Sequence, residues 1–160
     1  MAVAIAGCGS ASSGKQESAG SASSAPLITP SAPSSSSVVI SAKTLPGLGT
    51  VLVTGQGRTL YLFLPDKHGH VTCVNTCAQV WPPVKLASGQ KPVASGRVKP
   101  SLLGSDPDPE GGRVLTYAGW PLYTYVGDST PGSASGQGLN INGGLWYVLS
   151  PSGQPTTKTP

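Results

Sequence analysis

LVTGQGRTLYLFLPD, residues 52–66, has a second version farther along the chain, VLTYAGWPLYTYVGD, at residues 114–128. The two stretches align without a gap at a constant distance of 62 residues. Five positions are identical: Thr54 with Thr116, Gly57 with Gly119, Leu60 with Leu122, Tyr61 with Tyr123, and Asp66 with Asp128. Self-similarity at a fixed distance indicates an internal repeat. Because there are two copies, the sequence predicts a paired structure.

Each copy predicts two short strands joined by a glycine-containing turn. The predicted strands are residues 50–54 and 59–64 in the first copy and residues 113–117 and 121–126 in the second. A further strand is expected around residues 146–150, where Trp146 is the counterpart of Trp81 in the first copy. Short strands separated by Gly and Pro turns are typical of all-β folds.

The 59–64 strand is apolar on both faces. Side chains alternate along a strand, so Tyr61 and Phe63 face one way, and Leu60, Leu62 and Leu64 face the other. Such a strand belongs in the interior of stacked sheets, and neither copy could bury it alone. We therefore expect an all-β domain at residues 44–155, with two tandem repeats packed as a small β-sandwich or barrel with pseudo-twofold symmetry. The repeats would span about residues 48–90 and 110–153.

Composition excludes several classes of protein. The 22 Gly and 16 Pro among 160 residues argue against an all-helical fold. Charged residues make up only 10% of the chain, and the net charge of +4 comes from scattered Lys and Arg without interleaved aromatic residues, so we expect no nucleic-acid partner. No apolar run approaches the roughly 18 residues of a membrane-spanning helix.

The first residues resemble the end of a bacterial lipoprotein signal peptide. In Ile5-Ala6-Gly7-Cys8, an apolar residue and two small residues precede a cysteine, as in the lipobox. We interpret residues 1–8 as the remnant of a signal peptide and Cys8 as the lipidated residue. The charged region that usually opens such a peptide is missing, so we expect that translation starts farther upstream. These features predict an extracytoplasmic protein anchored in the cell membrane by lipid.

Residues 9–43 are expected to form a disordered tether. They consist mostly of Ser, Ala, Gly and Pro and could not bury enough apolar surface to offset the entropy lost on ordering. A flexible chain of this length would reach roughly 30–35 Å. The folded domain would then stand clear of the lipid headgroups.

In its predicted folded domain, the sequence resembles a family of bacterial secreted lipoproteins, common in actinobacteria, that carry a repeated Tyr-x4-Asp motif. The motif is present twice, as Tyr61 to Asp66 and as Tyr123 to Asp128. Several other segments fit the family pattern: Cys73-x3-Cys77-Ala78, Trp81-Pro82-Pro83, residues 116–123 and residues 136–148. The resemblance implies a surface lipoprotein of unknown function.

The three cysteines divide into one for lipid and two for each other. A Cys73–Cys77 disulfide would suit an oxidising location and would require a turn or distorted loop at residues 74–76. The alternative is a metal site, in which His68, His70, Cys73 and Cys77 bind zinc or copper. In that case the protein would be a metal-binding or redox-accessory lipoprotein.

The repeated motif residues are the other candidates for a site. Because their strands are apolar, we expect Tyr61 and Tyr123 in the core with hydroxyls paired at its rim, and Asp66 and Asp128 bonded to backbone amides in turns. No nucleophile motif accompanies them, so we expect no enzyme activity and no cofactor. The sequence predicts a non-catalytic binding or structural role toward an unknown protein or small-molecule partner.

Overall fold

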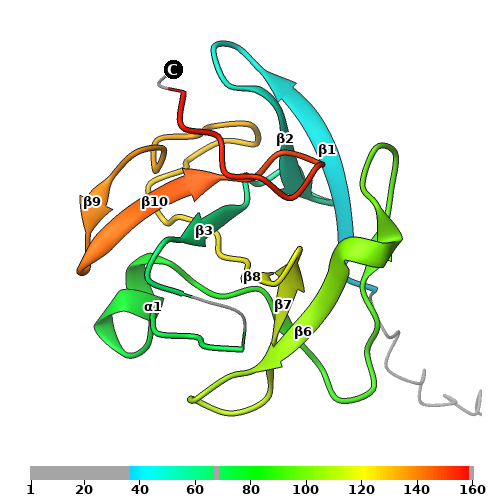
Figure 1. Ribbon diagram of the computed structural model, residues 1–160, viewed down its shortest axis with the longest axis vertical. Helices are drawn as coiled ribbons and strands as arrows, with labels where there is room; N and C mark the ends of the chain where they lie inside the picture. The colour runs from blue at the N-terminus through cyan, green and yellow to red at the C-terminus, as the bar shows by residue number, and fades with distance from the viewer. Residues whose placement is uncertain (1–36, 67–68, 159–160) are drawn as a thin grey trace, which may run out of the picture. The chain divides into compact units, whose positions relative to one another are not determined.

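The computed structural model describes residues 37–66 and 69–158 and is mostly β, with three small sheets and two repeats. Figure 1 shows the arrangement of these elements. Cys8, His68 and most of the predicted tether lie outside the described residues. Within residues 37–66 and 69–158, no helix has the length and apolar character needed to cross a membrane.

The first sheet has the order β2-β1-β5. β1 (Val39–Leu45) and β2 (Gly49–Thr54) form an antiparallel hairpin, and β5 (Val93–Ala94) pairs in parallel with the start of β1. The predicted boundary between tether and domain at residue 44 is therefore wrong, because residues 39–43 already lie in β1. The physical reason is that the hairpin pairs Ile40 with Thr54 and buries the Ile40 side chain completely.

The second sheet joins the two copies of the repeat. β3 (Tyr61–Phe63) of the first copy pairs antiparallel with β10 (Gly144–Val148) of the second, and β9 (Asn140–Ile141) lies at the edge. Figure 1 shows β3 and β10 side by side. The register places Phe63 opposite Trp146.

The third sheet is centred on β7 (Arg113–Tyr117), which matches the predicted strand at residues 113–117. β7 pairs with β4 (Lys85–Leu86), β6 (Leu103–Pro107) and β8 (Trp120–Pro121), always antiparallel. Across the described residues the three sheets do not join into a closed barrel.

The structure also departs from the predicted elements at one predicted strand and at two short helices. The predicted strand at residues 121–126 is wrong, because beyond β8 this segment only forms isolated bridges, from Tyr123 to Tyr61 and to Pro83. It passes between two other segments and bonds to both in turn, so no continuous ladder forms. Two short helices, α1 (Thr76–Val80) and the 3-10 helix η1 (Pro100–Leu102), were not predicted.

The core consists of two clusters, one on each face of β3. The aromatic cluster contains Tyr61 and Phe63, and the aliphatic cluster contains Leu60 and Leu62. The expected alternation along this strand is therefore confirmed for these residues. Leu64 lies just beyond the end of β3, is 36% exposed and belongs to neither cluster.

Candidate functional site

The two Tyr-x4-Asp motifs exchange hydrogen bonds across the interface between the repeats. The Tyr61 hydroxyl donates to Asp128 Oδ2 at 2.8 Å, and the Tyr123 hydroxyl donates to Asp66 Oδ2. Each tyrosine therefore binds the aspartate of the other copy. We call these four residues the Tyr–Asp exchange.

The backbone makes the same reciprocal contact. The Tyr61 amide donates to the Tyr123 carbonyl at 2.9 Å, and the Tyr123 amide donates to the Tyr61 carbonyl at 3.0 Å. The two tyrosines thus form an isolated antiparallel bridge at the point where the copies meet. In an antiparallel pair, residues that exchange both bonds are directly opposite each other.

Each aspartate is also held by the turn that follows it in its own copy. Asp66 Oδ1 accepts from the Thr72 amide at 2.8 Å and from the Thr72 hydroxyl at 2.5 Å. Asp128 Oδ1 accepts from the Ser135 amide at 2.8 Å. The aspartates do bind backbone amides, as expected. Both tyrosines lie in the core and both hydroxyls are paired, but the hydroxyls are fully buried rather than at the rim.

Four aromatic rings from the two copies form one stack beside the exchange. The order is Tyr125, Trp81, Trp146, Phe63, with centroid distances of 4.2, 3.9 and 4.2 Å between successive rings. The two indole rings in the centre are nearly parallel, with an interplanar angle of 2°. Each tryptophan therefore stacks on the tryptophan and on one aromatic ring of the other copy.

Each tryptophan also contacts the motif tyrosine of its own copy edge to face. The centroid distance is 5.3 Å for Tyr61 and Trp81 and 5.2 Å for Tyr123 and Trp146. Edge-to-face and offset-stacked pairs are the favoured geometries of aromatic rings. The exchange and the stack together form one packed unit that contains the same parts from both repeats.

Two glycines allow the rings to approach the backbone. A Cβ atom at Gly136 would lie 2.5 Å from Trp81 Cη2, and a Cβ atom at Gly144 would lie 2.9 Å from Phe63 Cε2. Both distances are far below van der Waals contact, and at Gly144 a Cβ atom would also lie 2.3 Å from Pro65 Cγ, so a larger side chain would displace Trp81 at the first position and Pro65 and Phe63 at the second. The turn that carries Gly136 and the start of β10 at Gly144 therefore belong to the packed unit.

Burial governs the protonation of the exchange. Desolvation, together with the neighbouring carboxylates, raises the pKa of Tyr61 and of Tyr123 far above their usual range, so both hydroxyls stay protonated and act as donors. Desolvation also raises the pKa of Asp66, against the opposing effect of its hydrogen bonds from Thr72 and Tyr123. All four side chains are buried and have their partners, which is the arrangement of a structural contact.

The disulfide joins Cys73 to Cys77, with a Cα–Cα distance of 5.2 Å. Asn75 between them has a positive φ of 55°, so the distorted turn lies at residues 74–75. Thr76, predicted in the same loop, is instead the first residue of α1. The loop is held from outside by Glu110, whose Oε1 accepts from the Asn75 amide at 2.7 Å.

The structure lends no support to the zinc or copper alternative. Both sulfur atoms lie in the disulfide, His70 is exposed, and His68 is outside the described residues. In residues 37–66 and 69–158, no group of three or more His, Cys, Asp or Glu side chains could hold a metal ion.

Sequence reasoning missed both the exchange and the tryptophan stack. A signal was present, since a tyrosine and an aspartate recur at one spacing beside a strand that is apolar on both faces. Buried polar groups need partners, and the aspartate of the second copy could supply one for the tyrosine of the first. The spacing alone does not choose between a bond within a copy and a bond between copies.

A family model described as a secreted repeat of unknown function matches residues 45–85 and 106–150. The first match contains Tyr61, Asp66 and Trp81, and the second contains Tyr123, Asp128 and Trp146. Both halves of the Tyr–Asp exchange and of the tryptophan stack are thus family segments. The chain matches neither a curated protein nor a solved structure.

Proposed function

The chain belongs to the lipoprotein family of this secreted repeat of unknown function, and we propose that it is a lipid-anchored protein of the cell surface with a non-catalytic binding or structural role. Membership of a secreted lipoprotein family implies an extracytoplasmic location. The cysteine disulfide in the described domain suits an oxidising compartment. Lipid anchoring and the non-catalytic role are the steps taken beyond the family.

The Tyr–Asp exchange is the observation that carries the non-catalytic role. The motif brings two carboxylates and two phenols together, and such groups in an open cleft would suit acid–base chemistry. Here Asp66 and Asp128 are 0% and 3% exposed, and each oxygen of the pair of carboxylates accepts a hydrogen bond from the protein. The polar groups of the repeated motif are therefore used to join the two copies.

We also propose that the two copies are related by a local pseudo-twofold axis that passes between Tyr61 and Tyr123. Three sets of contacts support it: the exchanged side-chain bonds, the exchanged backbone bonds, and the central pair of stacked tryptophans. In each set, the contact made by the first copy is repeated by the second. A rotation of about half a turn is the simplest operation that produces such reciprocity.

The anchor is assigned to Cys8, after residues 1–8 as the signal remnant and before a tether that ends close to β1. The lipobox-like sequence and the family support this assignment. Cys73 and Cys77 are bonded to each other, which leaves Cys8 as the cysteine for acylation. Two or more acyl chains would hold the protein on the membrane, since each buried CH₂ contributes about 0.8 kcal/mol.

Intact mass of protein extracted from membranes tests the anchor. We expect the mass of an acylated form that begins at Cys8, and a Cys8→Ala variant that is released from the membrane fraction. A Cys73→Ala/Cys77→Ala variant is the matched control, because it removes cysteines without touching the lipobox and should stay membrane-bound. Retention of the Cys8→Ala variant on membranes after a high-salt wash, which would remove purely electrostatic binding, would disprove lipid anchoring at this residue.

Tyrosine nitration under native conditions tests the structural role of the motif. Tyr61 and Tyr123 are fully buried, whereas Tyr125 and Tyr147 are partly exposed. We expect nitration of Tyr125 and Tyr147 first, with Tyr61 and Tyr123 modified only after unfolding. Equal modification of all four in the folded protein would show that the motif is open to reagents, and the proposed role would fail.

A further inference from the structure

The segment between the two family matches, residues 86–105, has a charge pattern of its own. It contains Lys91, Arg97 and Lys99 and no acidic residue. It lies outside both matched segments, so the family repeat does not account for it. We call it the inter-repeat linker, and it contains β5 and η1.

The linker lies beside the point where the N-terminal part of the chain reaches the domain. β5 pairs in parallel with the start of β1, with Val93 opposite Val39, and the Val93 amide donates to the Val38 carbonyl at 2.8 Å. Val38 follows directly after Ser37, the first residue that the structure describes. In a protein anchored through Cys8, the surface formed by the inter-repeat linker would therefore lie close to the point where the tether joins the domain.

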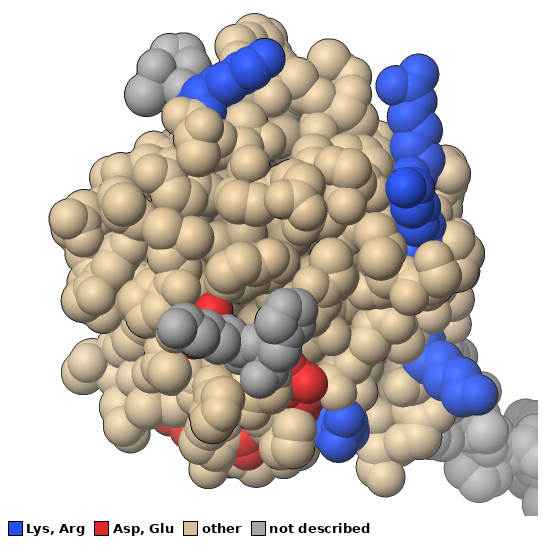
Figure 2. Space-filling model, viewed as in Figure 1, with Lys and Arg blue, Asp and Glu red and all other residues tan. Residues whose placement is uncertain are grey.

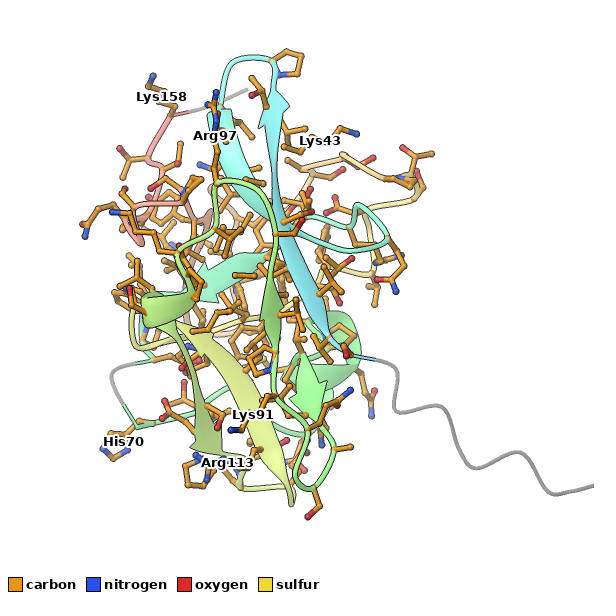
Figure 3. All side chains as sticks on the ribbon, turned by 90° about the vertical axis from the view of Figure 1, so that its right-hand side faces the viewer. Lys43, His70, Lys91, Arg97, Arg113 and Lys158 are labelled. Atoms are coloured by element: carbon orange, nitrogen blue, oxygen red, sulfur yellow. A yellow bond between two sulfur atoms is a disulfide. The ribbon has the colours of Figure 1, made fainter. Side chains whose placement is uncertain are left out.

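A groove of about 410 Å³ opens at the start of the linker, and two cations line it. The turn at residues 86–91 forms one side, and Ser105, Gly112 and Arg113 form the other. Lys91 is exposed and makes no ion pair with any acidic residue in the described part of the chain. Figure 3 shows Lys91 and Arg113 close together at one end of the domain.

Arg113 is held in place and keeps donors to spare. Its Nε donates to Ser105 Oγ at 2.7 Å, and its Nη2 donates to the Ser105 carbonyl. A guanidinium group carries five N–H donors, so the remaining ones are free to bind an anion, and the bidentate geometry of arginine suits phosphate oxygens. The cation is thus fixed at the wall of the groove by neutral groups.

The nearby acidic residues are engaged elsewhere. Asp106 accepts from the Gly69 amide at 3.1 Å, Glu110 accepts from the Asn75 amide, and Asp108 pairs with Lys85 at 2.9 Å. Figure 2 shows acidic side chains gathered in the lower part of the molecule, where basic atoms lie directly beside them, and further Lys and Arg side chains along the right-hand margin and at the top. Among the described residues, no carboxylate therefore forms an ion pair with Lys91 or Arg113, the two cations of the groove.

We propose that the groove between Lys91 and Arg113 binds the phosphate headgroups of an anionic phospholipid membrane and orients the anchored domain on it. The proposal rests on the lipid anchor proposed above. Val93, 44% exposed and next to the root of the tether, adds an apolar contact at the headgroup boundary. Basic residues beside a lipid anchor strengthen attachment to anionic leaflets, and an anchor of this kind holds the groove near its ligand.

Vesicle co-sedimentation with the full chain carrying Cys8→Ser tests the proposal without the anchor. We expect binding to phosphatidylglycerol/phosphatidylcholine vesicles at low salt, weaker binding at high salt, and none to pure phosphatidylcholine. Lys91→Gln/Arg113→Gln should bind about thirtyfold more weakly, the change expected for two cations at an anionic surface. Lys91→Gln alone should bind about fivefold more weakly, and it keeps the Arg113 to Ser105 bonds intact.

Lys43→Gln/Lys158→Gln is the matched control, because it removes the same charge from the end of the domain opposite the groove in Figure 3. It should bind vesicles nearly as well as the parent chain. Equal weakening in both double variants would show an effect of net charge only and would overturn the proposal. Saturable binding of inorganic phosphate without vesicle binding would also overturn it, in favour of a soluble anion. The mass measurement at Cys8 is independent of all these outcomes, so failure of the groove and failure of the anchor are distinguishable.

Discussion

The two copies of the repeat agree where they touch each other and differ where they do not. Tyr61 and Tyr123, and likewise Trp81 and Trp146, make matching contacts across the interface. Away from it, only the first copy contains a disulfide and the helix α1. The comparison teaches that the shared residues are those on which both copies depend at once, whereas each copy supports them by local means.

The local supports are unequal. Asp66 accepts three hydrogen bonds, two of them from Thr72, whereas Asp128 accepts one from Ser135 and one from Tyr61. The tryptophans show the opposite inequality. Trp146 Nε1 donates to the Ile141 carbonyl at 3.2 Å, whereas Trp81 Nε1 is buried without a hydrogen-bond partner in the described structure. These differences make the comparison testable.

Removal of either central tryptophan should have the largest effect. Trp81→Ala and Trp146→Ala should each lower the free energy of unfolding by about 3–5 kcal/mol, because each ring is fully buried between two others. Trp146→Phe should cost about 1 kcal/mol more than Trp81→Phe, since only Trp146 loses a hydrogen bond. Urea unfolding measures all four. An equal loss of stability in the two Phe variants would show that the hydrogen bond of Trp146 Nε1 does not contribute to the free energy of unfolding.

Loss of the exchanged carboxylates should come next. Asp66→Ala and Asp128→Ala should each lower the free energy of unfolding by about 2–4 kcal/mol. The larger value is expected for Asp66, because more donors lose their acceptor there. Asp106→Ala is the control, as its carboxylate serves one amide at the exposed Gly69, and it should cost under about 1 kcal/mol. The same denaturant titrations decide the order. A smaller cost at Asp66 than at Asp128 would contradict the comparison.

The disulfide supports one copy only, and its removal should have an intermediate effect. Cys73→Ala/Cys77→Ala should lower the free energy of unfolding by about 2 kcal/mol, the value for a very short closed loop. Unfolding of the parent protein with and without a reductant gives the control, since reduction should cost a similar amount and should leave the variant unchanged. A variant that still responds to the reductant would contradict this account.

The crossed pairing of the motifs can be read from double-mutant cycles. Tyr61→Phe and Tyr123→Phe should each cost about 1–2 kcal/mol, because each leaves a carboxylate oxygen short of a donor. The effects of Tyr61→Phe and Asp128→Asn on the free energy of unfolding should not be additive, whereas the effects of Tyr61→Phe and Asp66→Asn should be additive. The reverse pattern, with coupling inside one copy, would show that the hydrogen bonds are not exchanged.

The smallest expected effect is a dependence on pH at one copy. Burial raises the pKa of Asp66 in the folded protein above its ordinary value, so the folded state binds more protons than the unfolded state between the two values. The cost of burying the charged carboxylate is therefore present at neutral pH and is relieved as the pH falls through the folded pKa. Relative to Asp66→Asn, the parent protein should gain stability between neutral pH and pH 4. A loss of stability of the parent protein relative to Asp66→Asn over that pH range would contradict a raised pKa of Asp66 in the folded state.

Much of the scaffold could be predicted from residues close together in the chain. The repeat, the strand at residues 113–117 and the opposite faces of Tyr61 and Leu62 follow from spacing and alternation, which are local properties. β1 was missed because its short apolar start follows a long Ser-rich stretch, and only its partner β2 makes it a strand. The predicted strand at residues 121–126 failed because its partners are two separate segments.

By itself, the sequence determined that this protein is a duplicated, extracytoplasmic family repeat in which Tyr61 and Tyr123 are equivalent. Only the tertiary structure decided that Tyr61 binds Asp128 rather than the aspartate of its own copy, and that Lys91 of the linker meets Arg113 of the second repeat at one groove. A repeated motif indicates which polar groups will need hydrogen-bond partners when they are buried. Which partner satisfies each group depends on how two chain segments pack, and that geometry is not written in the spacing of either one.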